Sequence, residues 1–308
     1  MRQKSLDMVH MLAKQDPRVV FVGSDLGPET LRGMREEFPD RFFMEGVSEQ
    51  AIIGMAAGLA MEGYIPYVNT IATFITRRCY EQVALDLCLH KQKVRLIANG
   101  GGVVYAPLGP THLAIEDLAI MRALPHMTVI APVDAAEMER LMPLTLDIEG
   151  PVYIRLAKGG DPVVSKIEHG VAIGKGILHR EPGRVLICST GIMTTRALQA
   201  ADALAQIGIR AGVLHLHTVK PLDAEQIKSL VGNVELLVTA EEHVLTGGLG
   251  SAIVETLVDD PATRMPRMLR LGLPDRFAED YGSQDSLLAG YGLSPAGIAK
   301  SVENALQQ

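Results

Sequence analysis

A carboxylate, an aromatic ring, an arginine and a histidine follow one another at intervals that would bring them to one site of an α/β protein. Glu49 stands directly after an apolar run, at the expected start of a glycine-dotted helix. Phe74 and Arg77 follow the next apolar run, and His112 lies in a later loop rich in Gly and Pro. Parallel-sheet enzymes place their active residues at the carboxyl ends of strands. These side chains therefore predict one site, assembled from the ends of several strands.

The elements that position these residues alternate between short apolar runs and longer helical segments. Strands are expected at 19–22, 41–44, 65–68, 94–98, 128–131, 152–155, 185–189, 211–215 and 236–239. Helices are expected near 6–15, 48–61, 77–90, 115–123, 135–147, 194–207, 223–230 and 249–258, with a last helix from Pro295. Apolar strands that alternate with helices predict parallel sheets covered on both faces.

A stretch rich in Gly, Pro and charge interrupts this alternation after the sixth strand. We expect an α/β domain over 1–160, a linker over 161–183 and a second α/β domain over 184–308. The predicted fold class is thus α/β, with two successive three-layer domains and mostly parallel sheets.

Composition excludes several classes of protein. The chain has 308 residues, of which 47% are hydrophobic and 21% charged, so each domain has enough apolar residues for a core. Its formal net charge of -7 argues against nucleic acid and anionic membranes as partners. Three cysteines without metal-ligand spacing predict buried thiols, no metal site and a reducing compartment. No run is long enough to span a membrane and no signal peptide is evident, so we expect a cytoplasmic protein.

Each candidate residue also has an ordinary explanation. Glu49 complements the dipole of its helix, with Ser48 as the expected N-cap. A loop histidine such as His112 is more often a surface residue than a catalyst, and a solvated Arg77 is tolerable at a helix start. Arg155 ends a strand, so its head would emerge at the same sheet edge. The glycine-rich turns do not match a dinucleotide-binding pattern.

Taken in order, however, the motifs resemble the C-terminal half of transketolase and of 1-deoxyxylulose-5-phosphate synthase, which are thiamine diphosphate enzymes. In the first domain they are Ser24-Asp-Leu, Gly46-Val-Ser-Glu-Gln, Ala72-Thr-Phe-Ile-Thr-Arg, Gly109-Pro-Thr-His and Tyr153-Ile-Arg. In the second they are Val219-Lys-Pro-Leu-Asp, Val238-Thr-Ala-Glu-Glu-His, Gly247-Gly-Leu-Gly-Ser and Gly272-Leu-Pro-Asp-Arg-Phe. The resemblance spans nearly the whole chain and implies a pyrimidine-binding domain followed by a transketolase C-terminal domain.

The resemblance also implies how the cofactor is held. Glu49 matches the glutamate that hydrogen-bonds N1′ of the aminopyrimidine and helps the thiazolium C2 lose its proton. A group with that task needs a raised pKa in a buried site. Phe74 matches the aromatic that stacks on the aminopyrimidine. Asp25 and Leu26 match the loop that lies against the cofactor, where the leucine helps to hold its bent shape.

Other matched residues imply contacts with the substrate. His112 matches a histidine that bonds or protonates substrate oxygens. Arg155 matches an arginine that clamps a sugar phosphate or similar anion, and Arg77 is closer to the synthase pattern, in which it also binds phosphate. Leu108 stands where transketolases usually have an aspartate that reads a donor hydroxyl. We therefore expect a substrate that differs from the common pentose and hexose phosphates.

Further departures point the same way: Gly100 replaces a phosphate-binding histidine, Glu29 a phosphate-binding serine, and Gln50 the usual histidine after the glutamate. The Gly-Asp-Gly…Asn motif that binds Mg²⁺ and diphosphate is not found in the sequence. The resemblance therefore implies that thiamine diphosphate is shared with a separate N-terminal transketolase subunit, which binds the Mg²⁺, in an α2β2 heterotetramer.

The leading interpretation is a subunit of a split transketolase that moves a two-carbon (glycolaldehyde) unit from a ketose to an aldose. One alternative is the β-subunit of a 2-oxo acid dehydrogenase, or a decarboxylating carboligase like the deoxyxylulose-phosphate synthase. Another is a non-catalytic paralogue that binds a partner or a sugar. The three interpretations differ in donor and cofactor. A transketolase uses a ketose as donor, and the 2-oxo acid or carboligase alternative consumes pyruvate with release of CO2. The non-catalytic paralogue does not use thiamine diphosphate.

Overall fold

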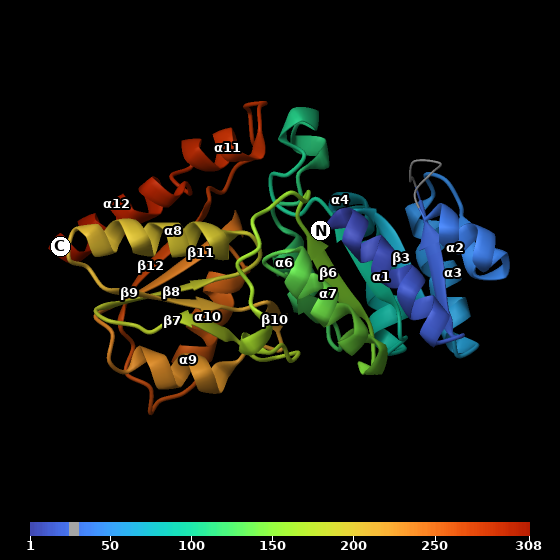
Figure 1. The fold of residues 1–308 in the computed structure, drawn as a ribbon, viewed down its shortest axis with the longest axis horizontal. Helices are drawn as coiled ribbons and strands as arrows, with labels where there is room; N and C mark the ends of the chain where they lie inside the picture. Colours follow the sequence, from blue (N-terminus) through green and yellow to red (C-terminus); the bar gives the residue numbers. More distant parts are fainter. Residues whose placement is uncertain (25–30) are drawn as a thin grey trace.

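A computed structural model describes residues 1–24 and 31–308 of the chain. The chain forms two lobes side by side, each built on its own sheet (Figure 1). The amino terminus lies where the lobes meet, and Met1 is buried there. No helix in the described ranges is both long and apolar enough to cross a bilayer.

The first lobe contains a seven-stranded sheet in the order β10-β5-β6-β4-β3-β1-β2. Its strands are β1 (Val19–Gly23), β2 (Phe42–Met44), β3 (Ile65–Ile71), β4 (Arg95–Asn99), β5 (Thr128–Ile130), β6 (Val152–Leu156) and β10 (Thr218–Lys220). All neighbours are parallel except β10, which runs antiparallel to β5. Central strands β1, β4 and β6 are buried along their whole length, as their continuous apolar runs predict.

Helices cover both faces of this sheet because alternate strand residues point to opposite sides. Phe21 belongs to the core cluster that also contains α1 and α7, whereas Val22 belongs to the cluster under α3. The helices of this lobe are α1 (Arg2–Gln15), α2 (Arg32–Glu37), α3 (Glu49–Met61), α4 (Ala72–Ile75), α5 (Tyr80–Gln82), α6 (Asp117–Ala123) and α7 (Ala135–Leu144). The lobe is therefore three-layered.

The second lobe repeats this arrangement around a five-stranded sheet in the order β12-β11-β8-β9-β7. Its strands are β7 (Ile177–Arg180), β8 (Val185–Ser189), β9 (Ala211–His215), β11 (Leu236–Val244) and β12 (Arg267–Leu273). Its helices are α8 (Met193–Gln206), α9 (Ala224–Val231), α10 (Leu249–Val258), α11 (Gln284–Gly290) and α12 (Pro295–Gln307). Helices α8 and α12 pack together on one face, with α9 and α10 on the other (Figure 1). The predicted class of two mostly parallel α/β domains is confirmed.

Several details differ from the sequence-based expectation. The helix expected over 77–90 is divided into the short 3-10 turn η2 (Arg77–Cys79), α5 and the π-helical turn η3 (Val83–Leu89). The break follows Thr76, whose φ of -102° and ψ of -84° are not helical. Part of the expected linker is structured, since β7 pairs antiparallel with β9 and so belongs to the second sheet. The three cysteines are free and buried, as expected.

Candidate functional site

Glu49 lies at the carboxyl edge of the first sheet, as the first residue of α3. Its side chain is only 2% exposed. The hydroxyl of Ser24, which follows β1, donates a hydrogen bond of 2.9 Å to Oε1 of Glu49. The guanidinium of Arg78 donates from NH1 to Oε2 at 2.6 Å. Both carboxylate oxygens therefore accept hydrogen bonds from side chains that other elements carry.

The pKa of Glu49 is lowered, whereas the sequence led us to expect a raised pKa. Burial alone would raise the pKa, but hydrogen bonds from Arg78, a backbone amide and Ser24 outweigh it and lower the pKa below its ordinary value. The expectation of a raised pKa was wrong because it did not take into account a cation, Arg78, beside the carboxylate. Glu49 is ionised in this arrangement.

Phe74 and His112 complete a cluster around Arg78. Phe74 lies in α4, directly after β3, and its ring centroid is 5.3 Å from that of His112, in an edge-on arrangement. The Cζ atom of Arg78 lies 4.2 Å from the Phe74 ring centroid, over its face. One guanidinium thus stacks on Phe74 while it pairs with Glu49. Arg78 thus links Glu49 to Phe74, and Phe74 in turn contacts His112.

Sequence reasoning did not assign Arg78 to the site, and it gave Ser24 no role. The available signal for Arg78 was its place beside Arg77, where two arginines begin a helical segment that also follows an aromatic residue. A cation in that position needs a nearby anion to offset the helix dipole. Glu49, whose side chain is almost completely buried, is that anion.

Arg77 points to a different set of partners. Its Nε lies 2.8 Å from Oε1 of Glu116, and its NH2 donates to the carbonyl of Leu113 at 2.7 Å. Arg77 therefore holds the loop that carries His112. It also borders a cavity of about 400 Å³ lined by Arg77, Ile115, Glu116, Val244, Asp275, Arg276 and Phe277. Burial raises the pKa of Glu116, although Arg77 opposes this shift, and Glu116 Oε2 has no hydrogen-bond partner.

Leu108 is half exposed, in the loop between β4 and His112. The following Gly109 has a φ of +77°, a conformation that favours glycine. A side chain at Gly109 would also collide with the ring of Tyr281 from the second lobe. The loop that presents Leu108 and His112 therefore packs closely against the second domain.

Arg155 does not join the cluster. It is 6% exposed, and its Nε lies 2.8 Å from Oδ2 of the fully buried Asp117. Its NH2 donates to the carbonyls of Ala114 and, at 2.8 Å, of Glu242 in β11. Burial alone would lower the pKa of Arg155, but Asp117 raises it. This geometry disfavours the expected anion clamp, because the guanidinium is already bound to protein acceptors from both lobes.

The remaining assignments concern residues 25–30. Asp25, Leu26 and Glu29 lie outside the described residues. Within the described ranges, no group of three or more His, Cys, Asp or Glu side chains is arranged to hold a metal ion.

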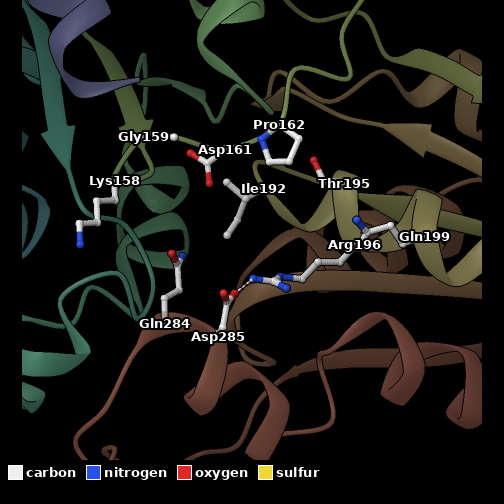
Figure 2. Close-up of a pocket in the computed structure, with 11 residues that line it drawn as sticks. Lys158, Gly159, Asp161, Pro162, Ile192, Thr195, Arg196, Gln199, Gln284 and Asp285 are labelled. Atoms are coloured by element: carbon white, nitrogen blue, oxygen red, sulfur yellow. Dashed lines mark hydrogen bonds and ion pairs between the residues drawn. The ribbon is translucent and has the colours of Figure 1, made fainter.

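A second cavity, of about 360 Å³, lies between the segment after β6 and the starts of α8 and α11 (Figure 2). Its lining includes none of the residues around Glu49. It is lined by Lys158, Gly159, Gly160, Asp161, Pro162, Ile192, Thr195, Arg196, Gln199, Gln284 and Asp285. In Figure 2, Arg196 points to Asp285, with which it forms an ion pair of 2.5 Å. This cavity is therefore separate from the candidate site.

Comparison with known families matches both lobes. Residues 1–160 match the family described as "Transketolase, pyrimidine binding domain", and residues 174–298 match "Transketolase, C-terminal domain". Similar proteins include the transketolase family protein y4mN of Sinorhizobium fredii, 40% identical over 96% of this chain and 86% of that protein. The subunit SqwH of a 6-deoxy-6-sulfo-D-fructose transketolase from a Clostridium species is 35% identical over 100% of this chain and 95% of its own length.

A third relative is longer than this chain. The 1-deoxy-D-xylulose-5-phosphate synthase 1 of Geobacter sulfurreducens is 39% identical over 96% of this chain, but the match covers only 46% of the synthase. Among solved structures, a split-gene transketolase described as an inactive β4 tetramer superimposes with a TM-score of 0.91. It is 36% identical, and the match covers 99% of this chain and 98% of that one.

Proposed function

Because the chain belongs to the transketolase family, we propose that it is the C-terminal subunit of a thiamine diphosphate-dependent transketolase built from two kinds of chain. In this role it transfers a two-carbon ketol unit from a ketose to an aldose. The observation that carries the proposal is that one guanidinium, that of Arg78, donates a hydrogen bond to Glu49 and lies over the ring of Phe74.

The residues present fit the aminopyrimidine half of thiamine diphosphate. A flat, hydrogen-bonding group already contacts both the buried carboxylate and the aromatic face in this structure, so a flat heteroaromatic ring suits the same surroundings. When bound, the cofactor supplies the nucleophile and the electron sink for breaking a carbon–carbon bond beside a carbonyl. Glu49 would hold and exchange a proton at N1′, and Phe74 would stack on the ring.

The other residues would act on the substrate. His112, in edge contact with Phe74, would hydrogen-bond or protonate substrate oxygens. Arg77 would attract an anionic group while it keeps the His112 loop in place. Leu108 presents no polar group to a donor hydroxyl, which supports a substrate other than the common sugar phosphates. The name of the relative SqwH, a subunit of a 6-deoxy-6-sulfo-D-fructose transketolase, supports an anionic group other than phosphate in the substrate.

We propose that a partner subunit supplies the site for Mg²⁺ and the diphosphate. The described residues contain no metal-binding cluster, and the chain spans about half the length of the synthase that it matches. Relatives of similar length are described as a transketolase subunit and as part of a split-gene transketolase. We infer an N-terminal-half partner that binds Mg²⁺ and the diphosphate, in an α2β2 assembly with active sites between subunits.

The similarity to the synthase supports a second candidate function, a decarboxylating carboligase. The range of donor substrates separates the transketolase from the decarboxylating carboligase. The chain is mixed with its N-terminal-half partner, Mg²⁺ and thiamine diphosphate, and a panel of ketoses, aldoses and pyruvate is tested. Transketolation predicts ketose-dependent extension of an aldose. Consumption of pyruvate with release of CO2 would reject it, and failure of the pair to bind the cofactor would reject both functions in favour of a non-catalytic paralogue.

A further inference from the structure

Arg78 makes two contacts at once, and their combination is unusual for a surface arginine. Its NH1 donates a hydrogen bond of 2.6 Å to Glu49, and its Cζ lies over the ring of Phe74, 4.2 Å from the centroid. A guanidinium is flat, delocalised and rich in donors, so it can stack and donate in its own plane. An aminopyrimidine ring shares these properties, and its proposed partners are the same two side chains.

We propose that Arg78 competes with the aminopyrimidine: its guanidinium makes the contacts to Glu49 and Phe74 that the ring needs, and it must leave before the cofactor binds. This inference rests on the proposed function, because it takes Glu49 and Phe74 as the partners of the ring. It goes beyond that function because it gives Arg78, which no resemblance assigned, control over access to the site.

The surroundings of Arg78 allow it to leave. Its side chain is 43% exposed, whereas Glu49 is 2% exposed, so the arginine forms the outer member of the pair. It belongs to the three-residue turn η2, which is not part of a long helix. Arg77 in the same turn is bound instead to Glu116 and to the carbonyl of Leu113. Arg78 can therefore move outward without releasing the loop that carries His112.

Departure of Arg78 would change the charge of Glu49. The groups that face this carboxyl are the hydroxyl of Ser24 at the end of β1, Arg78 and the thiol of Cys79 in η2, and the start of its own helix α3. Arg78 is the cation among them and the strongest single influence that opposes burial, so its removal raises the pKa of Glu49. Cofactor binding is thereby linked to proton uptake, which provides the neutral carboxyl that N1′ needs.

The test uses the chain together with its N-terminal-half partner and Mg²⁺. Calorimetric titration with thiamine diphosphate in buffers of different ionisation enthalpy gives both Kd and the number of protons taken up near pH 6.5. Wild type is expected to take up about one proton per site. Arg78→Ala is expected to bind about 3- to 10-fold more tightly, because no side chain competes for the ring's site, and to take up less than half as many protons.

Two further variants make the result specific. Arg184 is also exposed and paired with a carboxylate, that of Glu235, but it lies in the second lobe, so Arg184→Ala is expected to match wild type. Arg78→Lys keeps the cation without the planar face. It is expected to bind more tightly than wild type while it retains the proton uptake, and it serves as the main variant if Arg78→Ala does not fold.

The outcomes separate this inference from the function on which it rests. If the wild-type pair does not bind thiamine diphosphate, the proposed function fails and the inference fails with it. If wild type binds, but both Arg78 variants show unchanged Kd and proton uptake, the inference alone is overturned. Weaker binding by Arg78→Ala would also overturn it, since Arg78 would then be a ligand of the cofactor.

Discussion

His215 of β9 and Glu137 of α7 join the two lobes through a buried hydrogen bond of 2.9 Å between Nε2 and Oε2, and neither side chain is exposed. Burial alone would raise the pKa of Glu137, but His215 outweighs it and the pKa is lowered, so the carboxylate accepts and the imidazole donates. Nδ1 of His215 lies 2.6 Å from the hydroxyl of Thr194. The junction that positions the candidate site therefore contains a polar network without access to water.

Glu137→Ala is expected to destabilise the chain by about 3–5 kcal/mol, because it leaves His215 buried without its acceptor. It also removes the acceptor for the amide of Val133. Urea unfolding of the isolated chain, followed by circular dichroism, measures the loss. Glu139→Ala is the matched control, since Glu139 lies on the same helix in an exposed pair with Lys4. The control is expected to lose less than about 1 kcal/mol; equal losses would show that the buried pair does not hold the lobes together.

Acidification is expected to lower the free energy of unfolding, and His217 is expected to contribute to this decrease. Burial lowers the pKa of His217 to about 4, from an ordinary value of about 6.5. Between these values the unfolded chain binds the proton more readily than the folded chain, so stability falls as the pH drops from about 6.5 towards 4. Glu241 and Glu242, whose pKa values burial raises, act in the opposite sense over this range.

The contribution of His217 is therefore measured as a difference between variants. Unfolding free energies at about pH 7 and about pH 5 are compared for wild type and His217→Gln. The decrease on acidification is expected to be smaller in His217→Gln. His90→Gln, at an exposed position, should behave as wild type. The same decrease in wild type and His217→Gln would contradict a neutral, buried His217.

Arg155→Ala is expected to act mainly on stability. It leaves the buried Asp117 without its cation and removes the donor to Glu242, at an expected cost of about 3–5 kcal/mol. Arg155→Lys should not recover the lost stability, because one ammonium group cannot replace a guanidinium that donates from both Nε and NH2. The control is Arg180→Ala, which breaks a more exposed pair with Asp202. In the assembled enzyme, KM for anionic and neutral sugars should change equally; a rise confined to anionic sugars would restore the clamp assignment.

Glu49→Gln is expected to lower turnover of the assembled enzyme by about 10²-fold or more, because an amide cannot exchange the proton that the proposed reaction requires. Assembly, measured by analytical ultracentrifugation, should be unchanged. Glu62→Gln, at the opposite and exposed end of the same helix, is the control. Full activity of Glu49→Gln would remove Glu49 from the mechanism.

The sequence located every central strand, because continuous apolar runs are a local signal, although β3 and β11 extend beyond their predicted ends, to Ile71 and Val244. β9 was predicted to the residue, as Ala211–His215, and so was β8. The strands missed were β7, β10 and β12, at or near sheet edges. β10 has three residues, and β12 carries Arg267 and Arg270 in its run. A run that is very short or interrupted by charge lacks the continuous apolar pattern that identifies a central strand.

For the site, type and order in the sequence predicted Glu49, Phe74 and His112, and the structure places Phe74 beside His112. The tertiary structure alone decided which charges meet. Arg78 reaches Glu49 across 29 positions, and Arg155 reaches Glu242 across 87. No local periodicity encodes such pairs. Whether a charged side chain faces a ligand or another side chain depends on the packing of several elements, and this packing turned Arg155 inward and set Arg78 over Phe74.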